Sequence, residues 1–166
     1  MISLAAVSTD HTDLRKAYGC FPSGVTAVCA LSDGAPVGMA ASSFTAVSIS
    51  PPLVSVCVQL ASTTWPRLRG LPRLGVSVLA EDQDAACRAL AMKGGDRFAD
   101  LAWEANDDGA LFVNRATAWL ECSVYSELSA GDHLIALLEI HGFGSDPGRS
   151  PLVFHSSRFR HLSAAV

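Results

Sequence analysis

Most of the patterned stretches in this chain have the period of β-strands, in which alternate residues face opposite sides of a sheet. Val25–Leu31 is apolar and rich in β-branched residues, and Ser32-Asp33-Gly34 after it indicates a hairpin turn. The return strand is expected over Val37–Ala41. Phe44–Ser50 alternates between apolar and hydroxyl residues with one slip at Val47-Ser48, which predicts a β-bulge.

The rest of the chain continues this pattern. After the break at Pro51-Pro52, Leu53–Leu60 is almost continuously apolar, which predicts a strand buried on both faces. Gly131-Asp132 indicates another hairpin turn. Further strands are expected over Gly75–Ala80, Ala116–Leu128, His133–Phe143 and Pro151–Phe154.

Only short helices are expected. Thr9-Asp10 can cap a helix that ends at Gly19, and Phe21–Gly24 then reads as a turn. A short helix interrupted by a proline is expected over Trp65–Leu71, and a longer one over Gln83–Met92. Because the connections are of hairpin length and no βαβ alternation occurs, we expect a mainly antiparallel β barrel or closed sheet with a few short helices. Residues 1–166 are expected to form a single domain.

Composition narrows the class of protein. Hydrophobic residues make up 49% of the chain and charged residues 17%, which favours a compact domain that assembles as a homodimer. A net charge of −4 with scattered arginines argues against a nucleic-acid partner, and the local cluster Arg67–Arg73 is interpreted as a solvated turn. No apolar run approaches the roughly 20 residues of a membrane span. Met1–Val7 lacks the basic flank of a signal peptide, so a cytoplasmic location is expected.

The cysteines and the common catalytic motifs exclude several kinds of site. GxSxG, GxGxxG, GxxxxGK[ST], HExxH and CxxC are all absent, so neither a metal site nor a nucleotide loop of those types is expected. The five cysteines are odd in number, widely spaced and mostly within apolar stretches. They are interpreted as buried free thiols that act as small hydrophobic residues: Cys20, Cys29, Cys57, Cys87 and Cys122.

Two candidate sites remain. Gly38–Leu60 runs through small and hydroxyl residues and contains no strong acid or base, so its backbone N–H and C=O groups suit a flat ligand with polar edges. Ser62-Thr63-Thr64 follows at once and can hold a phosphate, although an ordinary Ser/Thr-rich turn is the alternative. The second candidate is His133, at a strand start where Asp132 is placed to orient its ring; a purely structural histidine is the alternative.

Taken together, these segments resemble the flavin reductase-like family, the short flavin reductases that serve two-component monooxygenases. The resemblance runs from about Leu14 to Leu162. It rests on the segments FPSGVTAV, GMAASSFTAVSISPPLVSVCV, GVSVLAEDQ, GDRFAD, ECSV, GDHLIALLEI and PLVFHSSRFRHL.

The resemblance implies an antiparallel FMN-binding split barrel of Greek-key type that is dimeric, with flavin near the dimer interface. The implied flavin-binding residues are Met39, Ala40, Ala41, Ser42, Ser43, Cys57, Val58, Gln59, Ser62, Thr64, Lys93, Arg97 and Phe98, with Arg97 as the charge partner of the phosphate. The implied nicotinamide side consists of His133, Phe154, His155, Arg158 and Phe159, with His133 as the candidate catalytic residue.

The implied activity is that of an NAD(P)H:flavin oxidoreductase. It would reduce FMN or FAD by hydride transfer from NADH or NADPH and supply reduced flavin, by diffusion, to a partner flavin-dependent oxygenase. Hydride transfer needs alignment more than reactive side chains, which agrees with the small, uncharged Gly38–Leu60 stretch. The alternatives are a flavin- or heme-binding split-barrel module without reductase turnover, and an oxidase with tightly bound FMN.

Overall fold

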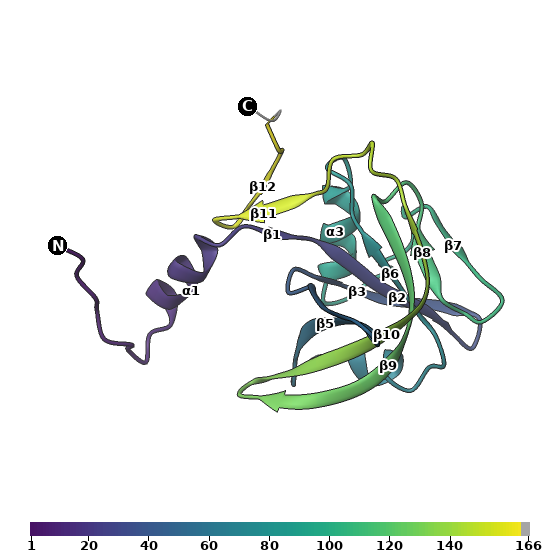
Figure 1. Ribbon diagram of the computed structural model, residues 1–166, viewed down its shortest axis with the longest axis horizontal. Coiled ribbons are helices and arrows are strands. Elements are labelled where there is room, and N and C mark those ends of the chain that lie inside the picture. The colour runs from purple at the N-terminus through teal and green to yellow at the C-terminus, as the bar shows by residue number, and fades with distance from the viewer. Residues whose placement is uncertain (164–166) are drawn as a thin grey trace.

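The computed structural model describes residues 1–163. Antiparallel strands are its main regular structure, with short helices at three places (Figure 1). In chain order the elements are α1 (Thr12–Gly19), β1 (Ser23–Gly24), β2 (Thr26–Ser32), β3 (Ala35–Ala41), β4 (Thr45–Ile49), β5 (Pro52–Gln59), α2 (Trp65–Leu68), β6 (Leu74–Val78), α3 (Asp84–Ala91), β7 (Trp103–Ala105), β8 (Leu111–Val113), β9 (Ala118–Ala130), β10 (His133–Ser145), β11 (Val153–His155) and β12 (Arg158–Arg160).

Residues that tolerate left-handed backbone set the hairpins of the main sheet. Asp33 (φ 52°) and Gly34 (φ 77°) form the two-residue turn between β2 and β3, which matches the right-handed strand twist. Gly131 (φ 66°) lies in the turn between β9 and β10. The predicted bulge is confirmed, because the register of β4 against β5 shifts between Ala46 and Ser48.

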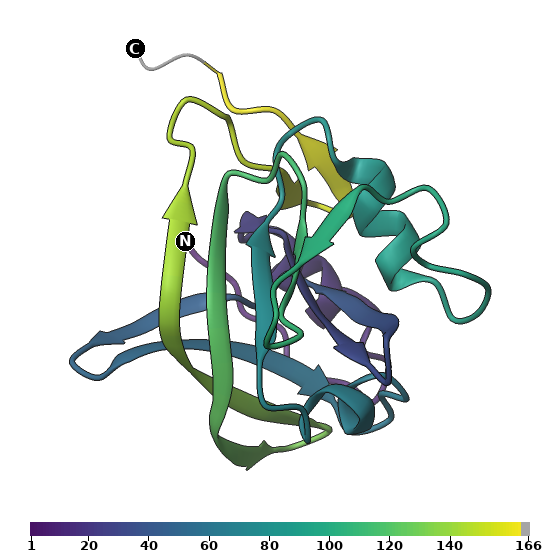
Figure 2. The same cartoon turned by 90° about the vertical axis from the view of Figure 1, so that its right-hand side faces the viewer.

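The main sheet has seven strands in the order β3-β2-β6-β9-β10-β5-β4, and every pair in it is antiparallel. The sheet curls strongly, so that the β4–β5 hairpin (blue in Figure 2) runs across the long β9 and β10 strands (green). The predicted mainly antiparallel β fold with short helices is therefore confirmed. Within residues 1–163, strand pairing does not close the sheet between β3 and β4.

Strand β2 lies between two hydrophobic cores, which explains its unbroken apolar sequence. Val28 and Ala30 belong to the core inside the curled sheet. Ala27 and Cys29 face a second core, formed with α3, β8 and the C-terminal hairpin of β11 and β12. Consecutive residues of one strand point to opposite faces, so both faces of β2 are buried.

The β7–β8 hairpin packs closely on the outside of the main sheet. An added Cβ at Gly75 in β6 would lie 2.1 Å from the carbonyl oxygen of Leu111, so only glycine permits this approach. The Ser77 hydroxyl is fully buried and accepts a hydrogen bond from the Val113 amide at 3.0 Å. These contacts place β8 over β6.

Several predicted boundaries were wrong. Ser23 and Gly24, expected in a turn, pair with β11, and α2 ends at Leu68. The β5 strand is not buried on both faces throughout, because Cys57 and Gln59 are exposed while Val54, Val56 and Val58 lie in the core. Cys57 and Gln59 point to the opposite face of the strand from these valines, and that face is open at this end of β5.

The prediction of uniformly buried cysteines was also wrong. All five thiols are free, but Cys20 and Cys57 are exposed. Cys87 is partly buried, and burial raises the pKa of its thiol. Full burial raises the pKa of Cys29 to about 12. Burial also raises the pKa of Cys122 to about 12, with a smaller contribution from the nearby Glu121 charge.

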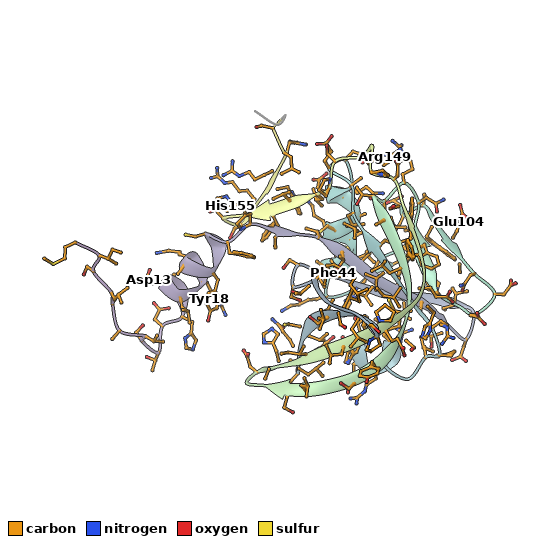
Figure 3. All side chains as sticks on the ribbon, in the orientation of Figure 1. Asp13, Tyr18, Phe44, Glu104, Arg149 and His155 are labelled. Atoms are coloured by element: carbon orange, nitrogen blue, oxygen red, sulfur yellow. The ribbon has the colours of Figure 1, made fainter. Side chains whose placement is uncertain are left out.

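The N-terminal segment and α1 extend away from the sheet (Figure 1). The Asp10 carboxylate accepts hydrogen bonds from the Thr12 amide and hydroxyl, but the N-cap of α1 is His11, which makes no side-chain capping hydrogen bond, so the predicted cap was wrong. No residue of α1 is buried, and Tyr18 projects from it into solvent (Figure 3). α1 is tied to the C-terminal hairpin where the Ser156 amide donates to the Gly19 carbonyl at 2.9 Å. No helix among the described residues has the length and apolarity needed to cross a membrane.

Candidate functional site

The two stretches expected to line a flat ligand lie side by side. The Ser43 hydroxyl accepts a hydrogen bond from the Cys57 amide at 2.8 Å and donates one to the Cys57 carbonyl at 3.2 Å. Ser43 thus acts as a strand partner for β5 beyond the point where β4 stops pairing. The loop after β3 is fixed to the exposed end of β5, and together they form a shelf, which we define as residues 39–43 and 57–59.

The shelf presents small groups and main chain. Ser42 and Cys57 are exposed, Met39 and Ala40 are partly buried, and Ala41 is buried. On β5 the Val58 side chain lies in the core, so the exposed neighbours Cys57 and Gln59 are the residues of this strand that offer side chains to a ligand. None of these residues carries a charge. The arrangement suits a planar ring held by backbone groups.

A polar pocket lies beyond Gly38, at the start of the shelf. Arg97 bridges its two sides, because its Nη1 donates to the Gly38 carbonyl at 2.9 Å and to the Thr64 hydroxyl at 2.9 Å. The pocket has a volume of about 250 Å³. It is lined by Pro36, Val37, Gly38, Thr63, Thr64, Arg67, Gly94, Gly95, Asp96, Arg97 and Phe98.

The chemistry of this pocket fits a phosphate. The Thr64 hydroxyl accepts from Arg97, so its own hydrogen remains available to donate to an anion. The guanidinium of Arg97 has three further N–H donors on Nε and Nη2, which suits a phosphate oxygen pair. Ser62 has a different role, since its hydroxyl accepts from the Trp65 amide at 3.1 Å and turns the chain into α2. Lys93 is exposed on the segment between α3 and the pocket.

Close packing under Gly38 holds Arg97 in place. An added Cβ at Gly38 would lie 2.4 Å from the Cys29 sulfur and 2.9 Å from the Phe98 ring, so only glycine fits. Phe98 is buried and meets Trp103 edge-on, with ring centroids 6.5 Å apart. Because Phe98 follows Arg97 directly, its burial fixes the backbone that carries the guanidinium.

The helix that carries Arg67 is anchored to the long hairpin. The Trp65 indole is buried, and its N–H donates to the Glu127 carboxylate on β9 at 2.6 Å. The other oxygen of Glu127 forms a salt bridge with Arg69. One carboxylate therefore holds both ends of α2 against β9, which keeps Thr64 and Arg67 at the pocket.

His133 lies beside the shelf. It is the direct cross-strand neighbour of Gln59, since β10 and β5 pair in that register. Its Nδ1 lies 2.7 Å from the Asp132 carboxylate, as the sequence predicted. This hydrogen bond and the charge of His133 lower the pKa of Asp132. The paired carboxylate directs the Nδ1 side of the ring and leaves Nε2 for another partner.

The C-terminal residues expected near the nicotinamide form a separate hairpin. Phe154 on β11 and Phe159 on β12 face each other with ring centroids 5.5 Å apart, and both pack on the second core. The Arg88 guanidinium lies 4.9 Å from the centre of the Phe159 ring. His155 lies on the side of the molecule where α1 projects (Figure 3), and Arg158 is exposed. Within residues 1–163, no hydrogen bond or salt bridge joins this hairpin to His133.

Sequence reasoning missed several pocket residues. Gly94 and Asp96 line the pocket, and so does Arg67, which was read as part of a solvated turn. Arg67 is indeed exposed, but it borders the cavity one helical turn after Thr64. The only feature of the sequence that could have indicated a role for Arg67 is its position three residues after Thr64, about one helical turn. No group of three or more His, Cys, Asp or Glu residues suited to a metal is found in the described part of the chain.

Comparison of the sequence with known proteins finds one family model and relatives that match most of the chain. Residues 18–163 match the family model described as "Flavin reductase like domain". An NADH-dependent FAD reductase from Streptomyces globisporus is 38% identical over 159 residues, which cover 93% of this chain and 87% of that protein. The reductase subunit of a flavin-dependent monooxygenase from Rhodococcus jostii (strain RHA1) is 31% identical over 157 residues, which cover 95% and 80% respectively.

A solved structure is similar over almost the whole length. It is the NADH:FAD oxidoreductase of Streptomyces globisporus C-1027 in complex with NAD and FAD fragments. Its TM-score is 0.91 at 37% sequence identity, and the match covers 98% of both chains.

Proposed function

The chain belongs to the flavin reductase-like family, as the sequence predicted, and we propose that it is an NAD(P)H:flavin oxidoreductase that reduces FMN or FAD. The observation that carries this proposal is the junction of shelf and pocket at Gly38. An uncharged surface for a flat ring leads there into a site for a phosphate, where Arg97 and Thr64 meet. A flavin nucleotide has these two parts in this order. The activity expected from the sequence is also the one named for the relatives.

Bound flavin supplies the hydride acceptor, so the protein's part is alignment and exclusion of water. The shelf carries no acid or base that would compete with hydride transfer. Ser43 holds the loop against β5 and so fixes the surface on which the ring lies. Arg97 and Thr64 bind the phosphate and set the position of the ring along the shelf.

His133 is the proposed contact of the nicotinamide nucleotide. Its pairing with Gln59 places it at the edge of the shelf, and Asp132 orients its ring. Phe154, His155, Arg158 and Phe159 are proposed to complete the nicotinamide side. Their separation from His133 within one chain favours a site that two copies of the protein build together.

A homodimer is therefore part of the proposal. The helix α1 has no buried residue, and large apolar side chains are exposed on α1, on the connection after it and on strands β4 and β9: Tyr18, Phe21, Val47, Tyr125 and Leu128. In the proposed dimer, the second copy covers part of this exposed apolar surface. We propose further that the reductase works in the cytoplasm and that reduced flavin diffuses to a partner oxygenase; a relative named as the reductase subunit of a flavin-dependent monooxygenase supports the existence of such a partner.

Steady-state assays test the proposed function. The purified protein is mixed with FMN, FAD or riboflavin and with NADH or NADPH, and nicotinamide oxidation is followed. We expect turnover only when flavin is added. The rates measured for each combination of flavin and nicotinamide also give the preference for each. A yellow protein that oxidises neither NADH nor NADPH, whichever of the three flavins is added, would refute the proposal.

A further inference from the structure

The polar pocket contains two arginines, and phosphate binding by Arg97 and Thr64 explains only one of them. Arg97 is partly buried and anchored to the Gly38 carbonyl and the Thr64 hydroxyl. Arg67 is exposed, and within residues 1–163 no carboxylate lies within salt-bridge distance of it. Its neighbours in sequence differ, because Arg69 pairs with Glu127 and Arg73 with Glu121.

The pocket is open on its Gly94-Gly95 side. An added Cβ at Gly94 or Gly95 would meet nothing within 4 Å, so this part of the lining is open. Gly95 has φ 77°, a conformation that a larger residue rarely adopts. Asp96 is the only acid in the lining, and its carboxylate already accepts a hydrogen bond from the Phe98 amide at 2.9 Å. The lining therefore carries two arginines against one carboxylate, a net positive charge.

The two arginines lie in order from the interior outward. Arg97 is partly buried next to the shelf, and Arg67 lies at the exposed side of the same cavity. A ligand with one phosphate uses Arg97 and Thr64 and ends there. A ligand with a diphosphate continues toward solvent and brings its second phosphate to the outer arginine.

We infer that the pocket is a diphosphate site in which Arg67 contacts the second phosphate of FAD, and that this contact makes the protein prefer FAD over FMN. The inference rests on the proposed function, because it takes flavin as the ligand of the shelf. FMN and FAD share the ring, the ribityl chain and the first phosphate, so preference between them depends on groups beyond Arg97. A charge-assisted contact to phosphate at an exposed position accounts for about a fivefold to tenfold difference in affinity.

Equilibrium dialysis with FAD, FMN and riboflavin tests the inference without relying on turnover. The variants are Arg67→Ala and Arg67→Glu, and Arg115→Ala is the matched control, because Arg115 is an exposed arginine outside this pocket that pairs with Asp82. Thermal melts check that each variant is folded. We expect Arg67→Ala to weaken FAD binding about fivefold to tenfold, and Arg67→Glu to weaken it more. FMN binding should change less than twofold, and riboflavin binding should not change.

Equal weakening of FAD and FMN by Arg67→Ala would overturn the inference, because Arg67 would then serve the first phosphate. Unchanged binding of all three flavins would overturn it as well. These results differ from a failure of the proposed function, in which the wild-type protein oxidises neither nicotinamide with any of the three flavins.

Discussion

Gly38→Ala should weaken both the fold and the phosphate pocket. The added methyl group would lie 2.4 Å from the Cys29 sulfur, 2.9 Å from the Phe98 ring and 3.1 Å from the Cys29 Cβ. Both neighbours are buried, so neither can move freely. Overpacking of this kind costs about 1–3 kcal/mol. In a protein of this size each kcal/mol lowers Tm by about 2–4 °C, so we expect Tm to fall by about 2–12 °C.

The same substitution should act on flavin binding through Arg97. Displacement of Phe98 moves the adjacent Arg97, whose guanidinium donates to the Gly38 carbonyl. FMN affinity should therefore fall while riboflavin affinity, which uses no phosphate contact, changes little. Thermal unfolding measures the first effect and equilibrium dialysis the second.

A control variant and a double-mutant cycle test whether the clash at Gly38 is what lowers Tm. Gly94→Ala should leave Tm unchanged, because its added Cβ has no neighbour within 4 Å. Cys29→Ala removes the sulfur atom that causes the closest clash, so its cost should be partly cancelled in the Gly38→Ala background. The packing argument is refuted if Gly38→Ala melts like the wild type, or if the two single effects simply add.

Three further predictions concern the shelf and its neighbours. His133→Ala should lower NADH turnover at saturating flavin without changing FMN affinity, and full turnover would remove the nicotinamide role of His133. A thiol reagent should modify two cysteines quickly in the native protein, Cys20 and Cys57, and FMN should protect only Cys57; protection of neither would place the ring elsewhere. Glu127→Leu leaves the buried Trp65 N–H unpaired, at a cost of about 1–3 kcal/mol. It should weaken FMN binding more than riboflavin binding, whereas Glu127→Gln, which keeps an acceptor, should do so less.

The sequence predicted the parts of the fold that depend on local chemistry. The Asp33-Gly34 turn follows from residues that accept positive φ, and the bulge near Val47 follows from a break in alternation. The short strands β7 and β8 were missed because three residues carry no usable period. Their position depends on a tertiary contact, the approach of the Leu111 backbone to Gly75.

The sequence also predicted the segments that form the site, but not every residue that lines it. Contacts between segments already suspected of binding the same ligand, such as Ser43 with Cys57 and Arg97 with Thr64, agree with the expected arrangement. Arg67 could not be found, because its relevance depends on the fold bringing the Gly94–Phe98 segment to α2. The exposure of Cys57 was hidden for a related reason. An apolar run predicts burial, but alternate residues point to opposite faces of β5, and the face that carries Cys57 is open at that end of the strand.

Anaerobic reduction of free flavin by NADH or NADPH tests the central claim most directly. A small amount of the protein is added to an excess of FMN or FAD with the nicotinamide, and the loss of the oxidised flavin's visible absorbance is followed. The account predicts that many equivalents of flavin are reduced per protein chain, because flavin is bound, reduced and released. Reduction that stops at one equivalent or fewer, with both flavins and both nicotinamides, would contradict it.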